Sequence, residues 1–355
     1  MAQKITEEEL VTRIRGEITD SLGYMGDTIS KQRESAMQYY YGLPFGNEVD
    51  GRSQFVDSTV QDTIEWIKPS LMRVFASGDE MVKFNPHGPE DVAMAEQATD
   101  YVNYVFTKDN PGWEILYSWF TDALLSKNGI VKVWWDEYEE AQREEYRGLD
   151  EIAFTALVSD DNVEVIEHTE YQDAEFNEYN ITLHDVVIKR SSSNGKIKIE
   201  NIPPSEFLIS REAKDIQEAR FVCHRVLKTL SELREMYPDQ DIEIEDLGGA
   251  DDDMADFSGE RLERYQFDKS ARYWEGWGGD ATYGEEGLRT YWLHESFLKT
   301  DYNNDGITEL RKICTVGSTV LANEEIDSIP FVSITPIKIP HKFFGLSIAD
   351  LVMDL

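Results

Sequence analysis

The spacing of apolar residues changes abruptly near residue 129, and this change constrains the fold more than any other feature of the sequence. Before that point, apolar residues recur every three or four positions, which is the spacing of helices with one buried face. After it, short runs of alternating apolar and polar residues dominate, which is the spacing of strands. The sequence therefore predicts an α+β fold, with a helix-rich first third followed by a mostly antiparallel β region.

The first helix is expected to begin at Thr6-Glu-Glu-Glu9, which matches a capping box. In that motif the threonine hydroxyl and a glutamate carboxylate satisfy backbone N–H groups that have no partner within the helix. Gly23 and Gly26 weaken the helix locally, so we expect a bend there. The run Tyr39-Tyr-Tyr-Gly-Leu-Pro44 ends it. Its apolar face consists of Val11, Ile14, Ile18, Leu22, Met25 and Ile29.

Three further helices complete the helix-rich part. One contains Pro69, which lacks a backbone donor and crowds the preceding turn, so this helix should kink or restart. The others span about 90–108 and 112–127, and Lys127-Asn-Gly129 is a suitable C-cap for the last of them. A short strand is predicted at Met81–Pro86. The residues expected to face inward are Val56, Val60, Ile64, Ile67, Leu71 and Val74, then Ala95, Ala98, Val102 and Val105, then Trp113, Leu116, Trp119, Phe120 and Leu124.

The β region begins at Gly129 and continues as short runs of strand-forming residues. Ser191-Ser-Ser-Asn-Gly195 is typical of a hairpin turn, and Thr229–Glu232 is a second capping box that opens a short helix. The charged segment 137–160 is expected to be helical or irregular. Strands are predicted at 129–135, 163–166, 181–183, 186–190, 197–202, 221–226, 289–297, 310–316 and 331–335.

Two segments of the β region are expected to be exposed loops. Residues 239–260 contain ten acidic residues and residues 276–287 are rich in glycine, and such compositions disfavour packing in a core. Ser347–Asp350 is a third capping box. The chain ends about two turns into the helix that this box opens, so we expect a fragment of a longer polypeptide.

These patterns divide the chain into three expected parts. Residues 1–128 form a helical part, and residues 129–338 form a β-rich part with acidic loops at 239–287. Residues 339–355 form the start of a further helix.

The charge of the chain restricts its partners. Seventy Asp and Glu residues against 34 Lys and Arg give a formal net charge of -36. Proteins that grip DNA neutralise its phosphates with Lys and Arg, so this chain is not a conventional DNA binder. A conduit for DNA is a different case, because weakly repulsive walls let the polymer slide. The composition therefore permits DNA passage without predicting it.

Two other features of the sequence bear on its cellular setting. No apolar run approaches the ~20 residues that span a bilayer, and the first residues lack the apolar segment of a signal peptide, so no membrane partner is expected. Cys223 and Cys314 lie far apart in separate strand-like runs. They are expected to be free, buried thiols, which suits assembly in a reducing cytoplasm.

Three segments carry a family resemblance. They are Gly51–Trp66 with Pro69–Phe75 and Val82–Pro86, then Thr300–Lys312, then Pro340–Asp350. The first resembles the polar turn, kinked helix and strand that open the N-terminal wing of portal proteins of short-tailed bacteriophages. The second is similar to an Asp- and Gly-rich turn between strands of that family, and the third to its passage from the wing into the helix approaching the channel stem. The three occur in the family's order over some 300 residues.

The resemblance implies the wing part of a portal subunit, assembled in the host bacterial cytoplasm into a ring of twelve at the capsid vertex of the virion. Double-stranded DNA would pass through the ring without sequence-specific contacts. The terminase large subunit, tail adaptors, capsid proteins and scaffolding proteins would be partners. Such a protein is structural, is not an enzyme and requires no cofactor. In relatives, the full stem, the motor-facing clip, the channel loops and the crown would follow Leu355.

One local motif resembles the first half of a calcium-binding loop, and it suggests a structural calcium ion. Oxygen ligands would alternate along the chain, and Gly306 at the sixth position would permit the sharp turn. Lys312 stands where an EF-hand has a bidentate glutamate, and strands flank the loop in place of helices. An Asn/Asp/Gly-rich hairpin turn explains the same residues without metal. The candidate ligands are Asp301, Asn303, Asp305, Ile307 through its backbone carbonyl, and Glu309.

No spacing in the sequence points to a catalytic site. Six scattered histidines show no metal-ligand spacing, and there is no nucleophile elbow, phosphate loop or dinucleotide loop. Trp274 and Trp277 lie in the glycine-rich segment and are expected to be exposed for docking on another protein. A calcium-stabilised β-rich carbohydrate-binding or carbohydrate-active protein is the alternative function. Trp113, Trp119, Trp134, Trp135 and Trp292 lie at helix or strand spacing consistent with core positions.

Overall fold

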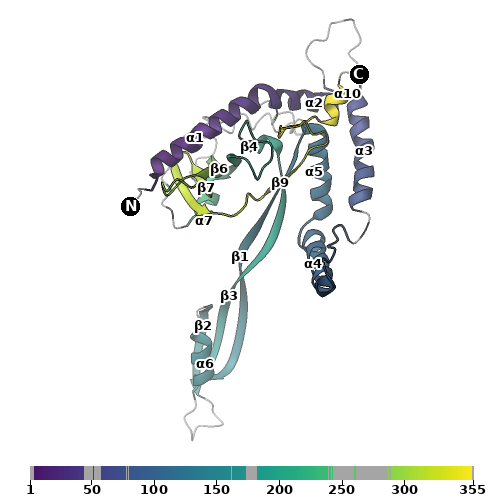
Figure 1. The fold of residues 1–355 in the computed structure, drawn as a ribbon. Coiled ribbons are helices and arrows are strands. Elements are labelled where there is room, and N and C mark those ends of the chain that lie inside the picture. Colours follow the sequence, from purple (N-terminus) through teal and green to yellow (C-terminus); the bar gives the residue numbers. More distant parts are fainter. Residues whose placement is uncertain are drawn as a thin grey trace. The chain divides into compact units, whose positions relative to one another are not determined.

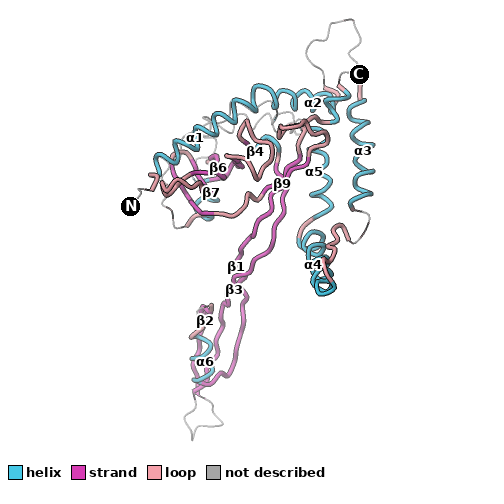
Figure 2. Tube along the Cα trace, viewed as in Figure 1, coloured by secondary structure: helices cyan, strands magenta, loops and turns pink. Residues whose placement is uncertain are grey.

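The computed structural model describes residues 4–43, 51, 57–76, 78, 80–160, 162–172, 182–238, 240, 242, 260, 287 and 289–353. The chain packs as two compact units, one of residues 1–133 and 199–355 and the other of residues 134–198. Helices dominate the first third and antiparallel strands follow, so the predicted α+β class is confirmed (Figures 1 and 2). The three-part division at residues 128 and 338 stays a prediction.

The first long helical segment forms as the apolar pattern predicts. Helix α1 (Glu7–Tyr24) starts where the Thr6 hydroxyl accepts the Glu9 N–H, and it continues through a π-helical segment, Met25–Ser30, into α2 (Lys31–Tyr41). The bend expected near Gly23 and Gly26 stays a prediction, and Gly26 lies in this π-helical segment. Helix α2 ends at Gly42, whose positive φ of 64° suits glycine. The six predicted inward residues of this segment, Val11 to Ile29, are all buried.

Three more helices follow in the same unit. Helix α3 (Thr59–Phe75) runs without interruption through Pro69, so it does not restart there. Helix α4 (Val92–Tyr104) leads into a π-helical segment, Val105–Asp109, and α5 (Gly112–Ser126) follows. Helices α2, α3, α5 and α10 (Ile348–Val352) share one apolar core. Of the residues predicted to face inward, Val56 lies outside the described part of the chain.

The segment Met81–Pro86 is extended but is not a strand, so that prediction is wrong. Its backbone bonds to side chains of α4 in place of a neighbouring strand. The amide oxygen of Asn103 accepts the N–H groups of Met81 and Val82 at 2.8 and 3.1 Å, and the Thr99 hydroxyl accepts that of Phe84 at 3.0 Å. Thr99 and Asn103, two buried polar residues of α4, thus bond to this backbone in place of the neighbouring strand that an extended segment usually needs.

A five-stranded antiparallel sheet forms the β part of the first unit. Its order is β4-β5-β6-β7-β8. The helix predicted at the second capping box is α7 (Leu230–Met236), where Thr229 and Glu232 satisfy each other's backbone N–H groups. The predicted strands of this region are thus confirmed. The strands are β4 (Phe207–Ile209), β5 (Phe221–Thr229), β6 (Thr290–Thr300), β7 (Glu309–Val316) and β8 (Thr319–Glu325).

The main core lies between α1 and this sheet. The apolar face of α1 packs in one cluster with residues of β4, β5 and β6. Phe331 is central to it, because its ring meets those of Phe207 and Phe297 edge-on at centroid distances of 5.3 and 5.4 Å. Such aromatic pairs add to the stabilisation that burial itself provides. Cys223 and Cys314 are buried thiols, as predicted.

The second unit contains a long antiparallel ladder. It holds most of β1 (Gly129–Asp150) and β3 (Thr182–Ile202), together with α6 (Glu151–Val158) and β2 (Val163–Gln172). The strand order is β2-β3-β1-β9, where β9 (Phe331–Ile334) pairs with the first residues of β1 inside the first unit. The segment 137–160, expected to be helical or irregular, is therefore strand up to Asp150 and helix only from Glu151.

The hairpin turn predicted at Ser191–Gly195 is wrong, because β3 continues through it. Gly195 has a different reason to be glycine. A Cβ atom at this position would lie 2.2 Å from the ring of Trp135 on β1, so only glycine allows this close approach. The predicted loops at 239–260 and 276–287, with Trp274 and Trp277, lie outside the described residues except for a few isolated positions.

Glu295 on β6 is the centre of a charged cluster within the first unit. It pairs with Lys132 of β1, and its carboxylate lies 3.5 Å from the Lys312 ammonium and 3.7 Å from His224 Nδ1. Burial alone would raise the pKa of Glu295. Hydrogen bonding to His224 and the charges of Lys132 and Lys312 outweigh burial and lower that pKa to about 2. The cluster joins the five-stranded sheet to the strand pair β1 and β9.

We predict that this cluster contributes to resistance against acid. The pKa of Glu295 is about 2 in the folded protein, against an ordinary value of 4.5 for a glutamate side chain. Its stabilisation is therefore complete above pH 4.5 and is lost as the pH falls towards 2, by an amount on the order of 3 kcal/mol. Glu295→Gln should flatten the decline of unfolding free energy over that range in denaturant titrations. Glu235→Gln, an exposed carboxylate on α7, is the control, and equal slopes for both variants would contradict the prediction.

Candidate protein-contact surface

Helix α3 exposes large apolar side chains on the side turned away from the core. Trp66 is 81% exposed and Val74 73%, whereas Phe75 lies on the side of Lys68, where its ring meets that of Phe120 at a centroid distance of 5.4 Å. The sequence pattern placed Val74 inward, and this is wrong. Exposed apolar groups of this size on one side of a helix mark a surface that another protein covers. Tryptophan is also the residue type most enriched among side chains that dominate protein interfaces.

A polar network explains why Trp66 points outward. Two residues along a helix differ by about 200° in direction, so Lys68 lies on the opposite side of α3 from Trp66. The buried Lys68 ammonium donates to the Tyr117 hydroxyl of α5 at 3.0 Å and lies 2.5 Å from the Glu65 carboxylate. The Tyr40 hydroxyl of α2 donates to the same carboxylate. These contacts fix α3 against α2 and α5.

The pKa shifts within this network favour the charged forms of Glu65 and Lys68. Burial would raise the pKa of Glu65, but hydrogen bonds from Lys68 and Tyr40 outweigh it and lower that pKa. Burial would lower the pKa of Lys68, but its bonds to Glu65 and Tyr117 raise it overall. Burial and the Glu65 carboxylate raise the pKa of Tyr40. The orientation of α3 is therefore held by an ion pair that persists at neutral pH.

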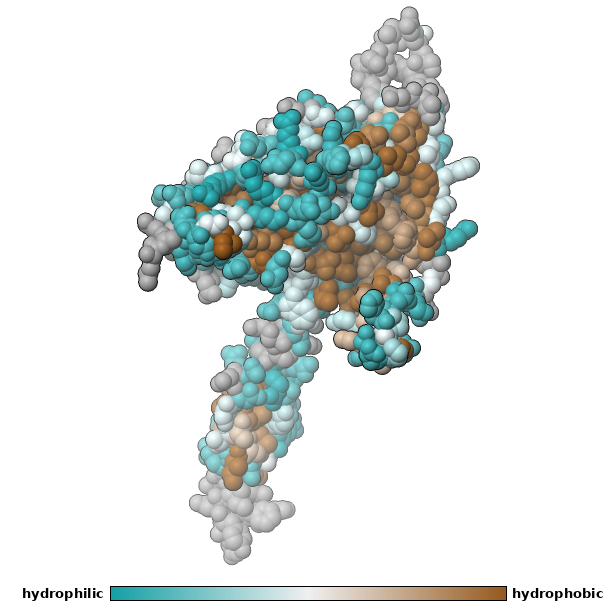
Figure 3. Space-filling view, viewed as in Figure 1, coloured by the Kyte–Doolittle hydropathy of each residue, from teal (hydrophilic) through white to brown (hydrophobic). Residues whose placement is uncertain are grey.

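Helices α4 and α5 also expose apolar and aromatic side chains. On α5, Trp113 is 56% exposed and its ring stacks on Tyr117 at a centroid distance of 5.4 Å. Figure 3 shows hydrophobic residues gathered over α3 and α5. Trp113 and Trp135 were predicted as core residues, and their exposure of 56% each corrects this, whereas Trp292 is buried as predicted. The contact surface is defined as Trp66 and Val74 of α3; the exposed apolar and aromatic residues of α4 and α5 are Val92, Met94, Tyr101, Tyr104, Trp113 and Tyr117.

The predicted metal loop is a turn between β6 and β7 that the chain closes with its own hydrogen bonds. The two carboxylate oxygens of Asp301 accept the N–H groups of Asp305 and Gly306 at 3.0 and 2.9 Å. The Asn303 amide donates to Glu309. Gly306 has a φ of 89°, which only glycine adopts readily. These bonds support the plain hairpin turn that the sequence left open.

The arrangement of the five candidate ligands leaves metal binding as a prediction. Glu309 also forms an ion pair with Arg311 at 2.9 Å, and Ile307 donates its N–H to Asp305 at 2.8 Å. Among the residues that the structure describes, no group of three or more His, Cys, Asp or Glu side chains is placed to hold a metal ion. The five predicted ligands also include the Asn303 amide and the Ile307 backbone carbonyl, which are not among these four side-chain types.

The structure brings together two histidines that sequence spacing did not connect. His168 Nε2 lies 2.9 Å from His184 Nδ1, and His184 Nε2 lies 2.8 Å from the Glu151 carboxylate. The ring of Phe154 stacks on both imidazoles at 4.5 Å. In the ladder His168 lies opposite Val186 and His184 opposite Glu170, so the two histidines are diagonal neighbours on one face, which sequence spacing did not indicate. The stacking fixes α6 on this ladder.

The three segments that carry the family resemblance take their places in the first unit. Residues 57–66 and 69–75 of the first segment lie on or next to α3, the second forms the turn between β6 and β7, and the third leads into α10. A family model described as phage SU10 portal protein matches residues 10–355. The chain belongs to this portal family. The search of curated proteins found no match.

Membership of a portal family carries functional consequences. It implies a structural, non-enzymatic subunit of a ring through which DNA passes, located at the capsid vertex of the virion. Within the described part of the chain, no helix is long and apolar enough to cross a membrane.

The hydrogen bonds of the Asp301 turn lead to a prediction about its stability. Asp301→Ala removes the acceptor of two backbone N–H groups, so the free energy of unfolding should fall by about 1–2 kcal/mol. The loss should be the same in calcium and in chelator if the turn is closed by hydrogen bonds alone. Thermal unfolding of this variant and of Asp305→Ala in both buffers makes the measurement. A melting temperature raised by calcium only in the unmodified chain would support the predicted ion.

Proposed function

We propose that the chain is the wing part of a portal subunit, and that twelve copies form the ring at the capsid vertex through which double-stranded DNA is packaged and ejected. The match of the portal family model over residues 10–355 carries this proposal. The terminase large subunit, tail adaptors, capsid proteins and scaffolding proteins are its proposed partners. The same family match displaces the hypothesis of a carbohydrate-binding or carbohydrate-active protein.

The contact surface supports a role in joining neighbouring copies. A ring requires each subunit to present two different faces, one to each neighbour. The exposed Trp66 and Val74 of α3 supply part of one such face. The network of Tyr40, Glu65, Lys68 and Tyr117 orients α3 before any partner binds, which reduces the entropy lost on association.

The acidity of the chain supports passage of DNA without retention. With a formal net charge of -36, the protein as a whole repels phosphates. DNA that moves through a conduit must not be held by the many Lys and Arg contacts that give binding proteins their affinity. We therefore propose that the ring guides DNA by shape and weak repulsion.

The proposal predicts that the full-length protein forms closed rings. Negative-stain electron micrographs at neutral pH should show particles with a central hole, and mass measurement in solution should give one defined multiple of the subunit mass. A protein that remains monomeric at concentrations of tens of micromolar would overturn the proposal.

A variant of the contact surface tests where neighbouring copies meet. Trp66→Ser should leave the stability of the isolated subunit within ~0.5 kcal/mol, because the side chain is exposed. It should weaken association by about 2 kcal/mol, or roughly 30-fold, as expected for a central interface tryptophan. Ile307→Ser, which removes a side chain 69% exposed on the turn between β6 and β7, is the matched control. Equal assembly of both variants would exclude Trp66 from the contact.

A further inference from the structure

The backbone of Lys127 is strained at the point where α5 passes into β1. Its φ is 74° and its ψ is -40°, a combination outside the left-handed helical region that a residue with a side chain adopts only at a cost in free energy. The positive φ lies at Lys127 and not at Gly129, the glycine of the predicted C-cap. Gly129 has another reason to be glycine, since a Cβ atom there would lie 2.3 Å from the Trp119 carbonyl oxygen.

The side chain of Lys127 explains why a lysine occupies this strained position. Lys127 is 3% exposed, and its ammonium donates to the carboxylate of Asp350 on α10 at 2.5 Å. The same carboxylate oxygen accepts the N–H and the hydroxyl of Ser347 at 2.7 and 2.8 Å, which completes the capping box of α10. A helix of only five residues is not stable by itself, so the position of α10 depends on contacts of this kind.

The residue after Lys127 ties the same junction to the start of β1. Asn128 is fully buried, and its amide group donates to the Thr335 hydroxyl at 2.9 Å and to the Phe343 carbonyl at 3.2 Å. Strand β1 begins at the next residue, Gly129, which pairs with β9. A rotation of the Lys127 backbone would therefore displace Asn128 and the first residues of β1.

We propose that Lys127 and Asp350 form a latch that couples α10 to the junction of α5 and β1. While the ion pair is closed, α10 is fixed on α5 and the Lys127 backbone keeps its strained φ. When the pair opens, that backbone relaxes to an ordinary φ, and the first residues of β1 lose part of their order. The coupling acts in both directions, because a change that favours the open state at one end favours it at the other.

Three substitutions separate the backbone strain from the ion pair. Lys127→Met removes the ammonium but keeps a side chain on the strained backbone, whereas Lys127→Gly removes both the ammonium and the strain. Asp350→Asn keeps an oxygen that accepts the Ser347 groups and removes the charge. Hydrogen exchange of the full-length protein, measured by mass spectrometry, should become at least tenfold faster at residues 348–352 in all three variants. Lys127→Gly should melt at a higher temperature than Lys127→Met, because only the methionine variant retains the strain.

Exchange at the far end of the latch distinguishes it from an ion pair that only adds stability. Asp350→Asn should also speed exchange severalfold at residues 129–132, while exchange in β6 should not change. Lys338→Met, which replaces an exposed lysine between β9 and α10, is the control and should alter neither segment. An effect of Asp350→Asn confined to α10, or a uniform rise in exchange throughout the first unit, would overturn the proposal. So would unchanged exchange of α10 in Lys127→Met, or a melting temperature of Lys127→Met at or above that of Lys127→Gly.

Discussion

The buried side chain of Arg33 is the contact on which the arrangement of the first unit depends. From α2 it donates to the Ser126 carbonyl at the end of α5 at 3.0 Å and to the Pro204 carbonyl before β4 at 3.1 Å. Its guanidinium lies 3.6 Å from Glu260 and 5.5 Å from the centroid of the Phe344 ring. Burying a charge is costly unless such partners surround it, so these segments must keep their places together.

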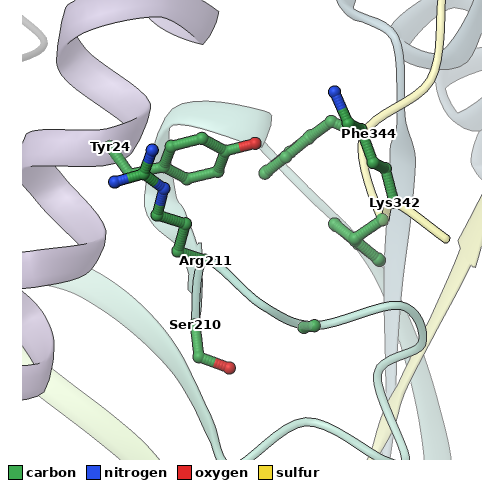
Figure 4. Close-up of a pocket in the computed structure, with 7 residues that line it drawn as sticks. Tyr24, Ser210, Arg211, Lys342 and Phe344 are labelled. Carbon is green, nitrogen blue, oxygen red and sulfur yellow. The ribbon is translucent and has the colours of Figure 1, made fainter.

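The contact surface is built outward from this centre. Helix α5, whose last carbonyl group accepts a hydrogen bond from Arg33, carries Tyr117, and the bond from Lys68 to Tyr117 then fixes α3 with Trp66 exposed. Phe344, which lies against the Arg33 guanidinium, also lines a small pocket with Tyr24, Arg211 and Lys342 (Figure 4). The exposed position of Trp66 therefore depends on a rigid core.

The sequence predicted most of the fold and little of the surface. Periodicity found the buried face of α1, and the capping boxes located the starts of α7 and α10, because these signals are local. It failed at Met81–Pro86, where the hydrogen-bond partners are side chains of the helix that follows and not another strand. It failed for Trp113, because an apolar residue at helical spacing looks the same whether its own chain or another protein covers it. The family resemblance, carried by three short segments, supplied the function that periodicity could not.

The acidity of the chain and its exposed apolar side chains are two parts of one design for a ring that carries DNA. Copies with a formal charge of -36 repel one another, but at physiological ionic strength this repulsion fades beyond about 8 Å. Apolar contact acts only at closer range, so a surface such as that around Trp66 brings copies together where complementary faces meet. The charge remaining on other surfaces opposes nonspecific association and repels phosphates. Short-range attraction between subunits and long-range repulsion of DNA can therefore operate in the same protein.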